Sequence, residues 1–251
     1  MSTLQGKSAL ITGGGQGVGR GIALALAAEG ARVAITGRTP SKLDATVAEI
    51  ERRGGQAMAV PGDVKIEADI ERTVDAVVRE FSTIDILVNN AQEVTLGPLL
   101  TMERHDFEAG WLSGPLAAFS FMKACHPHLC GGGVIINLVT SAALRPDGND
   151  YGVYSAVKEA MRSLTRTAAC EWGPQGVRVV NLLPLASSSA FEGWSAARPE
   201  EAAAFVATVP LQRIGDSEAD IGRIAVFLCG PDASYITGTT IMADGGQAYL
   251  R

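Results

Sequence analysis

The sequence predicts an α/β fold: a single doubly wound domain with a seven-stranded parallel sheet and helices on both faces. Short apolar runs alternate with longer amphipathic runs along the whole chain, as is typical of consecutive βαβ units. A glycine-rich segment separates the first apolar run from the first amphipathic one. Neither a low-complexity linker nor a solenoid-like repeat interrupts the pattern, so we expect one domain over 1–251.

The apolar runs are too short for helices and predict buried strands. They lie at 8–12, 32–36, 57–60, 84–89, 134–138, 177–181 and 239–242. The first helix is expected to follow the first strand, because Val18, Ile22 and Leu26 recur at helical spacing, and Gly30 should end it. Further helical patterns run from about 41 to 54, 65 to 81, 103 to 129 and 153 to 173.

Composition limits the class of protein. Apolar residues make up 47% of the 251 residues, enough for a large core. The 21 basic and 27 acidic residues give a net charge of −6, which argues against nucleic-acid binding. There is no uninterrupted apolar run of about 18 residues to span a membrane, and 1–7 do not resemble a signal peptide. With only four cysteines, we expect a cytoplasmic protein with reduced thiols.

The glycine-rich segment predicts a dinucleotide site. It reads Thr12-Gly13-Gly14-Gly15-Gln16-Gly17-Val18-Gly19, between the first strand and the first helix. Glycines at this place allow a tight turn and let a pyrophosphate approach the free N–H groups of the helix. Because glycines also occur in ordinary loops, the position inside a βαβ unit is what favours the cofactor site.

The end of the second strand favours NADP(H) over NAD(H). An NAD site usually has a carboxylate here to bind the ribose 2′-hydroxyl. This chain has Gly37 followed by Arg38, so no carboxylate would repel a 2′-phosphate and a guanidinium could pair with it. The other interpretation of Arg38 is a solvated loop cation.

A tyrosine and a lysine lie four residues apart, at Tyr154 and Lys158, on one face of a predicted helix. Two hydroxyl residues, Thr140 and Ser141, follow the fifth strand. The spacing of thirteen residues to Tyr154 favours Ser141 as the hydroxyl partner of the tyrosine and lysine, whereas the spacing from the end of the fifth strand favours Thr140. We select Ser141. Tyr151 is a less suitable acid, because no lysine follows it at the same spacing.

With these residues the chain resembles the short-chain dehydrogenase/reductases, a family with a Rossmann-type fold. The resemblance spans the chain and includes the glycine-rich segment, Ser141, Tyr154 and Lys158. It also includes Gly62-Asp63-Val64, Asn89-Asn90-Ala91, Asn181 to Pro184 and Asp244-Gly245-Gly246.

The resemblance implies that Tyr154 exchanges a proton with the substrate oxygen while hydride moves at the nicotinamide. Lys158 would bind the nicotinamide ribose, and Ser141 would polarise the substrate oxygen. A free tyrosine has a pKa of about 10, so an efficient base near neutrality needs help from Lys158 and the oxidised cofactor. By the same resemblance, the cofactor contacts are Gly13, Gln16, Gly17, Val18, Gly19, Arg38, Asp63, Val64, Asn90, Tyr154, Lys158 and Pro184.

The chain departs from the family at three places. Gln92 replaces the glycine that usually ends Asn-Asn-Ala-Gly, and Leu185 replaces the glycine of a Pro-Gly pair. Both larger side chains are expected beside the nicotinamide, where they would reshape the substrate pocket. Gly114 stands where the family usually has a catalytic asparagine that supports a helix kink.

Pro115 follows Gly114 directly, and a proline inside a helix kinks it by removing a hydrogen-bond donor. We therefore expect Gly114 and Pro115 to replace the structural role of the asparagine. In the family, the backbone carbonyl of that asparagine holds a proton-relay water. Here the water would lie on the carbonyl of Trp111 or Gly114.

Two further segments carry residue types that suggest a metal site or a substrate lid. Cys125, His126, His128 and Cys130 are metal-binding residue types, but their spacing matches no familiar zinc site, so we expect no metal. The segment of about 186–209 should form a substrate lid, in which Phe191, Trp194 and Phe205 either face a partly apolar substrate or belong to the core.

The sequence thus predicts a cytoplasmic, NADP-preferring enzyme that interconverts a small carbonyl compound and an alcohol, without a nucleic-acid or membrane partner. By resemblance it should form a homotetramer or a dimer that pairs the helices at 103–129 and 153–173. The alternative is a non-catalytic nucleotide-binding protein, suggested by Gly114, Gln92 and Leu185. An epimerase or dehydratase would need acid–base groups that the sequence does not reveal.

Overall fold

The computed structural model describes residues 3–144 and 150–248, so the two ends of the expected domain and 145–149 lie outside the described residues. Its sheet has seven strands in the order β3-β2-β1-β4-β5-β6-β7, and every neighbouring pair is parallel, which confirms the predicted fold class. The strands are β1 Ser8–Thr12, β2 Arg32–Gly37, β3 Gln56–Pro61, β4 Ile86–Asn89, β5 Val134–Leu138, β6 Arg178–Pro184 and β7 Thr240–Ala243.

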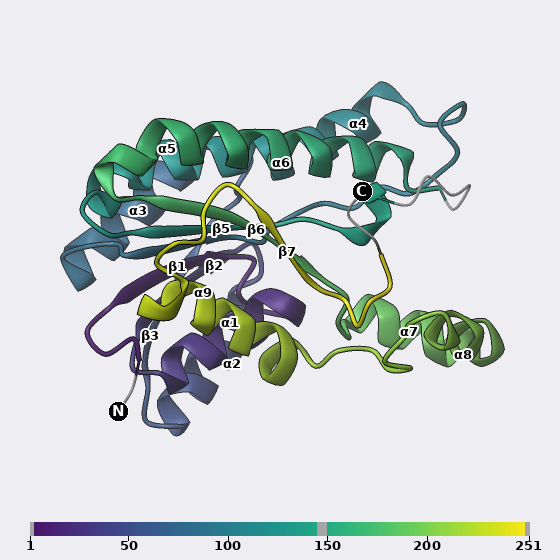
Figure 1. The fold of residues 1–251 in the computed structure, drawn as a ribbon, viewed down its shortest axis with the longest axis horizontal. Coiled ribbons are helices and arrows are strands. Elements are labelled where there is room, and N and C mark those ends of the chain that lie inside the picture. The colour runs from purple at the N-terminus through teal and green to yellow at the C-terminus, as the bar shows by residue number, and fades with distance from the viewer. Residues whose placement is uncertain (1–2, 145–149, 249–251) are drawn as a thin grey trace.

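Helices cover both faces of the sheet (Figure 1). Helices α1 (Gly17–Ala28), α2 (Pro40–Arg52) and α9 (Arg223–Cys229) lie on one face. The other face carries α3 (Glu67–Phe81), α5 (Ala117–Leu129) and α6 (Gly152–Trp172). Helix α4 (Arg104–Trp111) precedes α5, and the pair α7 (Ser189–Ala197) and α8 (Pro199–Ala207) projects from the carboxyl edge.

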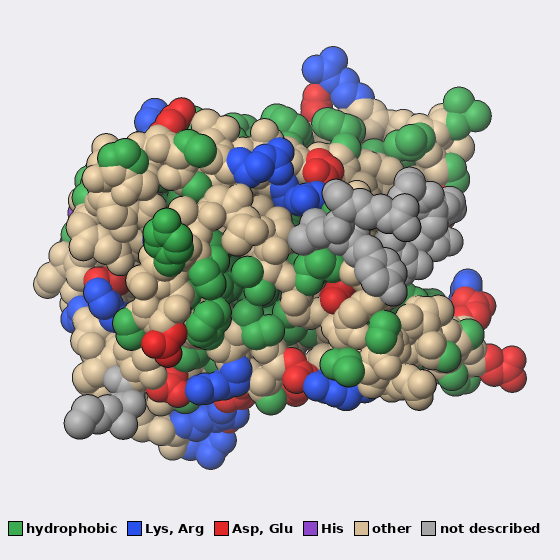
Figure 2. Space-filling view, viewed as in Figure 1, with side chains coloured by type: hydrophobic (Ala, Val, Ile, Leu, Met, Phe, Trp, Pro, Cys, Tyr) green, Lys and Arg blue, Asp and Glu red, His purple; other side chains and the backbone are tan. Residues whose placement is uncertain are grey.

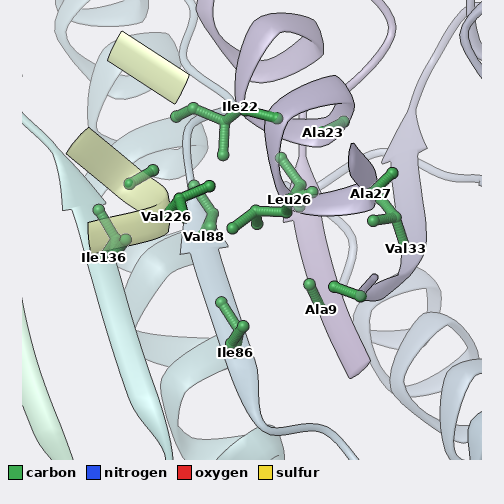
Figure 3. Packing of buried hydrophobic residues seen from close by; sticks show 14 of the residues in the cluster. Ala9, Ile22, Ala23, Leu26, Ala27, Val33, Ile86, Val88, Ile136 and Val226 are labelled. Atoms are coloured by element: carbon green, nitrogen blue, oxygen red, sulfur yellow. The ribbon is translucent and has the colours of Figure 1, made fainter. Parts of the chain in front are cut away.

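Each strand contributes alternate side chains to two cores, one on each face. Figure 3 shows the core beneath α1 and α9, where Ile22 and Leu26 pack with Val88, Ile136 and Val226. The neighbouring strand residues, such as Leu87 and Ile135, enter the opposite core under α3, α5 and α6. Burial on both faces explains why the strands are apolar throughout rather than alternating.

Three features add to the sequence prediction. The long helix expected at 103–129 consists of α4 and α5 joined by a π-helical turn, Leu112–Leu116. The lid segment forms the two helices α7 and α8, and α9 was not foreseen. Within the described ranges, no helix has the length and apolarity needed to cross a membrane.

The order of the strands places the site. β1 has β2 on one side and β4 on the other, so the chain changes direction across the sheet between these two neighbours. Loops that leave the carboxyl ends of β1 and β4 therefore diverge and open a crevice, which is where doubly wound sheets bind ligands.

A row of polar side chains, three of them buried amides, crosses the sheet near this edge. Asn89, Asn137, Asn181 and Thr240 are direct register partners on β4, β5, β6 and β7. Asn89 Nδ2 donates to Asn137 Oδ1 at 2.8 Å, and Asn181 Nδ2 donates to Thr240 Oγ1 at 3.3 Å.

Thr165 of α6 joins the two halves of this row. Its hydroxyl accepts from Asn137 Nδ2 at 2.8 Å and donates to Asn181 Oδ1 at 2.7 Å, and its side chain is fully buried. Because buried polar groups must be paired, this contact favours one axial position of α6 over the sheet.

Replacing Thr165 by valine should therefore destabilise the protein by about 2–4 kcal/mol, because an amide donor and an amide acceptor would both lose a buried partner. Urea unfolding measures the change. Thr73→Val is the matched control: Thr73 is equally buried, but its hydroxyl donates only to the Asp69 carbonyl of its own helix. Equal losses in the two variants would contradict the role given to Thr165.

Candidate active site

The glycine-rich loop leads into a helix whose N-terminus is free to bind an anion. Gln16, at the N-cap of α1, makes no side-chain capping bond, and the first turn has no acidic residue. Gly13, Gly15 and Gly17 line the cleft in front of this turn. Uncapped N–H groups and the positive end of the helix dipole thus face a cleft suited to a pyrophosphate.

Asn90 holds the glycine-rich loop in place. Its Nδ2 atom donates to the carbonyls of Thr12 at 2.9 Å and Gly13 at 3.2 Å. A Cβ atom on Gly19 would lie 2.4 Å from this nitrogen, so any larger residue there would displace it. Gly19 is therefore required for packing, and Asn90 both lines the cleft and supports its floor.

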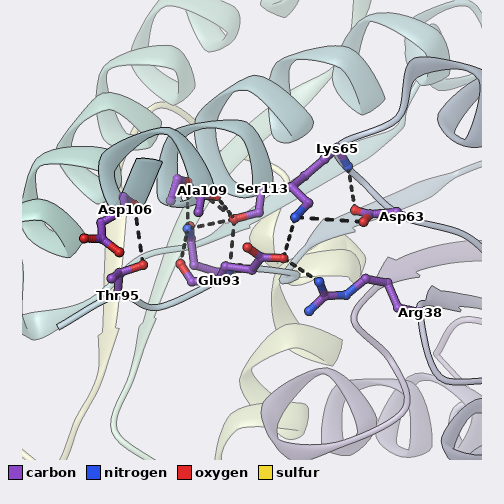
Figure 4. Close-up of polar contacts among 10 residues, drawn as sticks. Arg38, Asp63, Lys65, Glu93, Thr95, Asp106, Ala109 and Ser113 are labelled. Atoms are coloured by element: carbon purple, nitrogen blue, oxygen red, sulfur yellow. Dashed lines mark hydrogen bonds and ion pairs between the residues drawn. The ribbon is translucent and has the colours of Figure 1, made fainter. Parts of the chain in front are cut away.

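Arg38, at the end of β2, is paired with a carboxylate, which corrects the expectation that no carboxylate lies near its guanidinium. Arg38 lines the cleft and is about 60% exposed, and its Nη1 atom lies 2.5 Å from Glu93 Oε1. Lys65 Nζ contacts the same oxygen at 2.8 Å and lies 4.0 Å from Asp63 Oδ2. Figure 4 shows this chain of charges, in which Glu93 lies between the two cations.

Most of the expected cofactor residues meet in one cleft. Those that line it are Gly13, Gln16, Gly17, Val18, Arg38, Asp63, Val64 and Asn90. Gly19, Tyr154, Lys158 and Pro184 are not among the described residues lining it. Pro184 ends β6 beside Ala243, and Leu185 lines a separate hollow with Leu211 and Met242.

Lys158 is buried on α6, with 2% of its surface exposed. Its Nζ atom donates to the carbonyl of Leu138, the last residue of β5, at 2.7 Å, and lies 5.7 Å from the centre of the Tyr154 ring. Burial disfavours the ammonium ion and lowers the pKa of Lys158 to about 7. The lysine can thus change its charge near neutral pH.

Burial acts on Tyr154 in the opposite direction and raises its pKa to about 12, against a smaller lowering by a hydrogen bond with Thr140. Without a bound cofactor, Lys158 therefore does not lower the pKa of Tyr154 towards 7. The phenol is protonated at pH 7, which suits it to donate a proton to a substrate oxygen.

The two candidate hydroxyls point to different partners. Thr140 Oγ1 accepts from the backbone N–H of Ala142 at 3.3 Å and acts on Tyr154 by lowering its pKa, whereas Ser141 Oγ donates to Gln247 Oε1 at 3.2 Å. The spacing from the fifth strand, which favours Thr140, agrees with this effect on Tyr154. Ser141 as the catalytic hydroxyl stays a prediction, with Thr140 as the alternative.

Gly114 lies inside the π-helical turn together with Pro115, and both residues are buried. Since proline lacks the N–H that an α-helix would use, a widened turn accommodates it. The expected distortion of the helix is thus present at this place. The Gly114 carbonyl accepts from the backbone N–H of Ala117 at the end of the turn.

The lid helices are joined by their aromatic side chains. Ring centres of Phe191, Trp194 and Phe205 lie 5.7–6.4 Å apart, in tilted and edge-on arrangements. Each ring remains partly exposed. These residues hold α7 against α8 and leave apolar surface at the carboxyl edge of the sheet.

The cysteine–histidine segment makes other contacts. Cys125 is fully buried, which raises its pKa, and His126 packs against Trp172 with ring centres 4.7 Å apart. Within 3–144 and 150–248, no group of three potential metal-binding side chains comes together.

Several residues of the site are not among those predicted from the sequence. Glu93, Ser113 and Ser188 line the cleft, and Gln247 holds Ser141. Glu93 lies two residues after the Asn89-Asn90-Ala91 motif, so its nearness to that motif could have indicated a place at the cleft. Gln247 and Ser188 arrive from distant parts of the chain, and no local pattern predicts that.

An uncapped helix N-terminus at the end of β1 and a tyrosine–lysine pair on α6 are the arrangement expected of a dinucleotide-dependent oxidoreductase. The profile of a protein family described as enoyl-(acyl carrier protein) reductase matches residues 13–248. The chain belongs to the short-chain dehydrogenase/reductase family and is an oxidoreductase.

Similar proteins cover nearly the whole chain. A 12α-hydroxysteroid dehydrogenase of Clostridium sp. is 38% identical, covering 98% of both chains. A hydroxynaphthalene reductase of Aspergillus fumigatus is 33% identical, covering 94% of this chain and 90% of its own. Among solved structures, a short-chain dehydrogenase of Burkholderia cenocepacia in complex with NADP is 33% identical, with a TM-score of 0.90 and 98% and 99% coverage.

The lowered pKa of Lys158 predicts a pH-dependent difference in stability. Below pH 7 the folded protein carries a buried ammonium ion at Lys158, which lowers the free energy of unfolding. Above its folded pKa of about 7 the buried lysine is neutral, whereas the lysine of the unfolded chain stays charged up to its ordinary pKa, so the free energy of unfolding rises with pH between these two values. Lys158→Met lacks this ionisable group. Its free energy of unfolding minus that of the wild type should thus fall by about 1.4 kcal/mol per pH unit between pH 7 and 9. Urea unfolding across this range measures it, and parallel profiles would contradict it.

Proposed function

We propose that the protein is an NADP(H)-preferring oxidoreductase that transfers hydride between the nicotinamide and a small carbonyl compound or alcohol. The observation that carries this proposal is the placement of Tyr154 and Lys158 on α6, beside the carboxyl end of β5, in a sheet whose β1–α1 turn fits a pyrophosphate. When bound, the dinucleotide supplies or accepts the hydride.

The chain's own residues handle the proton. Tyr154, protonated at neutral pH, donates its hydroxyl proton to the substrate oxygen during reduction. Thr140 lowers the pKa of that phenol, and Ser141, fixed by Gln247, is the second hydroxyl for the substrate oxygen. Lys158 exchanges protons near pH 7 and is the group best suited to replenish the tyrosine. Gly114 contributes through the shape of its turn rather than through a side chain.

The lid favours a compact, largely apolar substrate. Phe191, Trp194 and Phe205 form its aromatic surface, and no cationic cluster on α7 or α8 suggests an anionic substrate among the described side chains. Relatives named as a hydroxysteroid dehydrogenase and a hydroxynaphthalene reductase support a cyclic alcohol or ketone.

The charges at the end of β2 support NADP(H). Arg38 has Glu93 as its partner, and a 2′-phosphate would offer the same guanidinium a more highly charged one. NADP and NADPH complexes of structural relatives, from Burkholderia cenocepacia and from a metagenomic library, are consistent with this preference.

Apolar surface supports assembly into a dimer or tetramer through the long helices. Phe107, Trp111, Leu112, Leu116 and Phe119, on α4, the π-helical turn and α5, are each 38–46% exposed. A second apolar region lies in the middle of the face in Figure 2, where Figure 1 places the edge strand β7 and α9. Sheet edges and apolar stripes of this kind are commonly covered by another subunit.

The proposed chemistry predicts NADPH oxidation by the purified protein with a panel of cyclic ketones, aldehydes and quinones. Tyr154→Phe should lower kcat by about a thousand-fold, since it removes the proton donor. Tyr151→Phe is the matched control, because its ring lies 6.2 Å from that of Tyr154, and it should stay within about three-fold of the wild type. NADPH binding without turnover on any substrate would instead favour a non-catalytic nucleotide-binding protein.

The cofactor preference depends on Arg38. Arg38→Ala should weaken NADPH binding about ten-fold, the value of one partly exposed charge-assisted hydrogen bond, and leave NADH binding within about two-fold. Fluorescence titration measures both. Arg52→Ala, on the exposed side of α2, is the control. An equal loss for the two nucleotides would exclude a 2′-phosphate contact.

A further inference from the structure

Two of the departures from the family pattern lie against each other in space. A Cβ atom on Gly114 would lie 2.3 Å from Oε1 and 3.0 Å from Nε2 of Gln92. The carboxamide of Gln92 therefore occupies the volume that a side chain at position 114 would fill. Gln92 also lines the cofactor cleft, so its expected place beside the nicotinamide stays a prediction, while the end of its side chain turns towards the long helix.

The carboxamide is held in one orientation. Its Nε2 atom donates to the carbonyl of Gly110 at 2.9 Å and to that of Glu93 at 3.0 Å, and lies 3.3 Å from Ser113 Oγ. The opposite orientation would place an oxygen against two carbonyl oxygens, so the hydrogen bonds fix the assignment. Oε1 is left buried without a partner among the described residues.

These contacts connect the cofactor cleft with α6. On one side, Glu93 pairs with Arg38 and Lys65, and its backbone N–H donates to Ser113 Oγ at 2.9 Å. On the other side, Gly110 packs against α6: a Cβ on it would lie 3.7 Å from Val157 and 3.9 Å from Val153. Val153 and Val157 directly precede Tyr154 and Lys158.

We propose that Gln92 and Gly114 form an exchanged pair, in which the Gln92 carboxamide does from the β4 loop what a side chain at position 114 would otherwise do from the helix. Gln92 is then a positioning residue: it fills the space at the π-helical turn and fixes Gly110 against the helix that carries Tyr154 and Lys158. The inference extends the proposed function, because it assigns a role in placing that acid–base pair.

A double-mutant cycle tests the exchange. Gly114→Asn alone should lower Tm by about 5 °C or more, because its side chain overlaps Gln92. Gln92→Gly alone should also lower Tm, because two carbonyls lose their donor and a void opens. Each single variant should lower kcat about ten-fold or more by displacing the acid–base pair. In the double variant Gln92→Gly/Gly114→Asn, Tm should return to within about 2 °C of the wild type and kcat to within about three-fold.

Gly173→Asn is the matched control, since a Cβ at that helical end would meet no atom within 4 Å. It should change Tm by less than about 2 °C. The exchange is wrong if the Tm loss of the double variant equals the sum of the two single losses. Tm can be measured even if the wild type turns over no substrate. A wrong assignment of Gln92 and Gly114 can therefore be distinguished from a wrong proposed activity.

A third variant separates hydrogen bonding from filling of space. Gln92→Glu keeps the shape but directs a carboxylate oxygen at the carbonyls of Gly110 and Glu93, which also raises the pKa of the new carboxyl. Once protonated, that carboxyl can donate one bond again. The kcat of Gln92→Glu relative to wild type should therefore rise about three-fold or more from pH 8 to pH 5.5. The charged groups nearby, Glu93 with Arg38 and Lys65, are the same in both proteins. A flat ratio would overturn the positioning role.

Discussion

The position of α6 over the sheet is the constraint on which the site depends. A helix that packs on a sheet through apolar contacts alone can shift along its axis at little cost, but a buried hydroxyl with two amide partners cannot. Thr165 has such partners in Asn137 and Asn181, which are neighbours in the register of β5 and β6. Seven residues before Thr165 on the same helix, Lys158 reaches the last carbonyl of β5.

The carboxyl edge of the sheet also carries the other end of the site, the cleft proposed for the cofactor. The β1–α1 turn presents an uncapped helix N-terminus, and Asn90 from the neighbouring β4 loop supports it. The next residues of that loop, Gln92 and Glu93, turn in opposite directions: Gln92 contacts the helix layer that packs on α6, and Glu93 contacts the cations of the cleft. One short loop therefore contacts both the cleft at the N-terminus of α1 and the helix layer that packs on α6, which carries Tyr154 and Lys158.

The sequence was sufficient for the fold and for residues that act within local motifs. Seven apolar runs predict seven parallel strands because doubly wound strands are buried on both faces, and Tyr154 and Lys158 are four apart because one helical turn separates them. Contacts between distant segments were not predictable in the same way. The overlap of Gln92 with Gly114 depends on how closely the β4 loop approaches the π-helical turn, and the raised pKa of Tyr154 depends on burial that no spacing encodes.

The most direct test of this account is a crystal structure of the protein with bound NADP. We predict that the pyrophosphate lies at the N-terminus of α1 and that the nicotinamide end lies beside Tyr154 and Lys158. The 2′-phosphate should lie within hydrogen-bond distance of Arg38 and replace Glu93 as the partner of its guanidinium. A dinucleotide whose nicotinamide end lies away from α6, or whose 2′-phosphate makes no contact with Arg38, would contradict it.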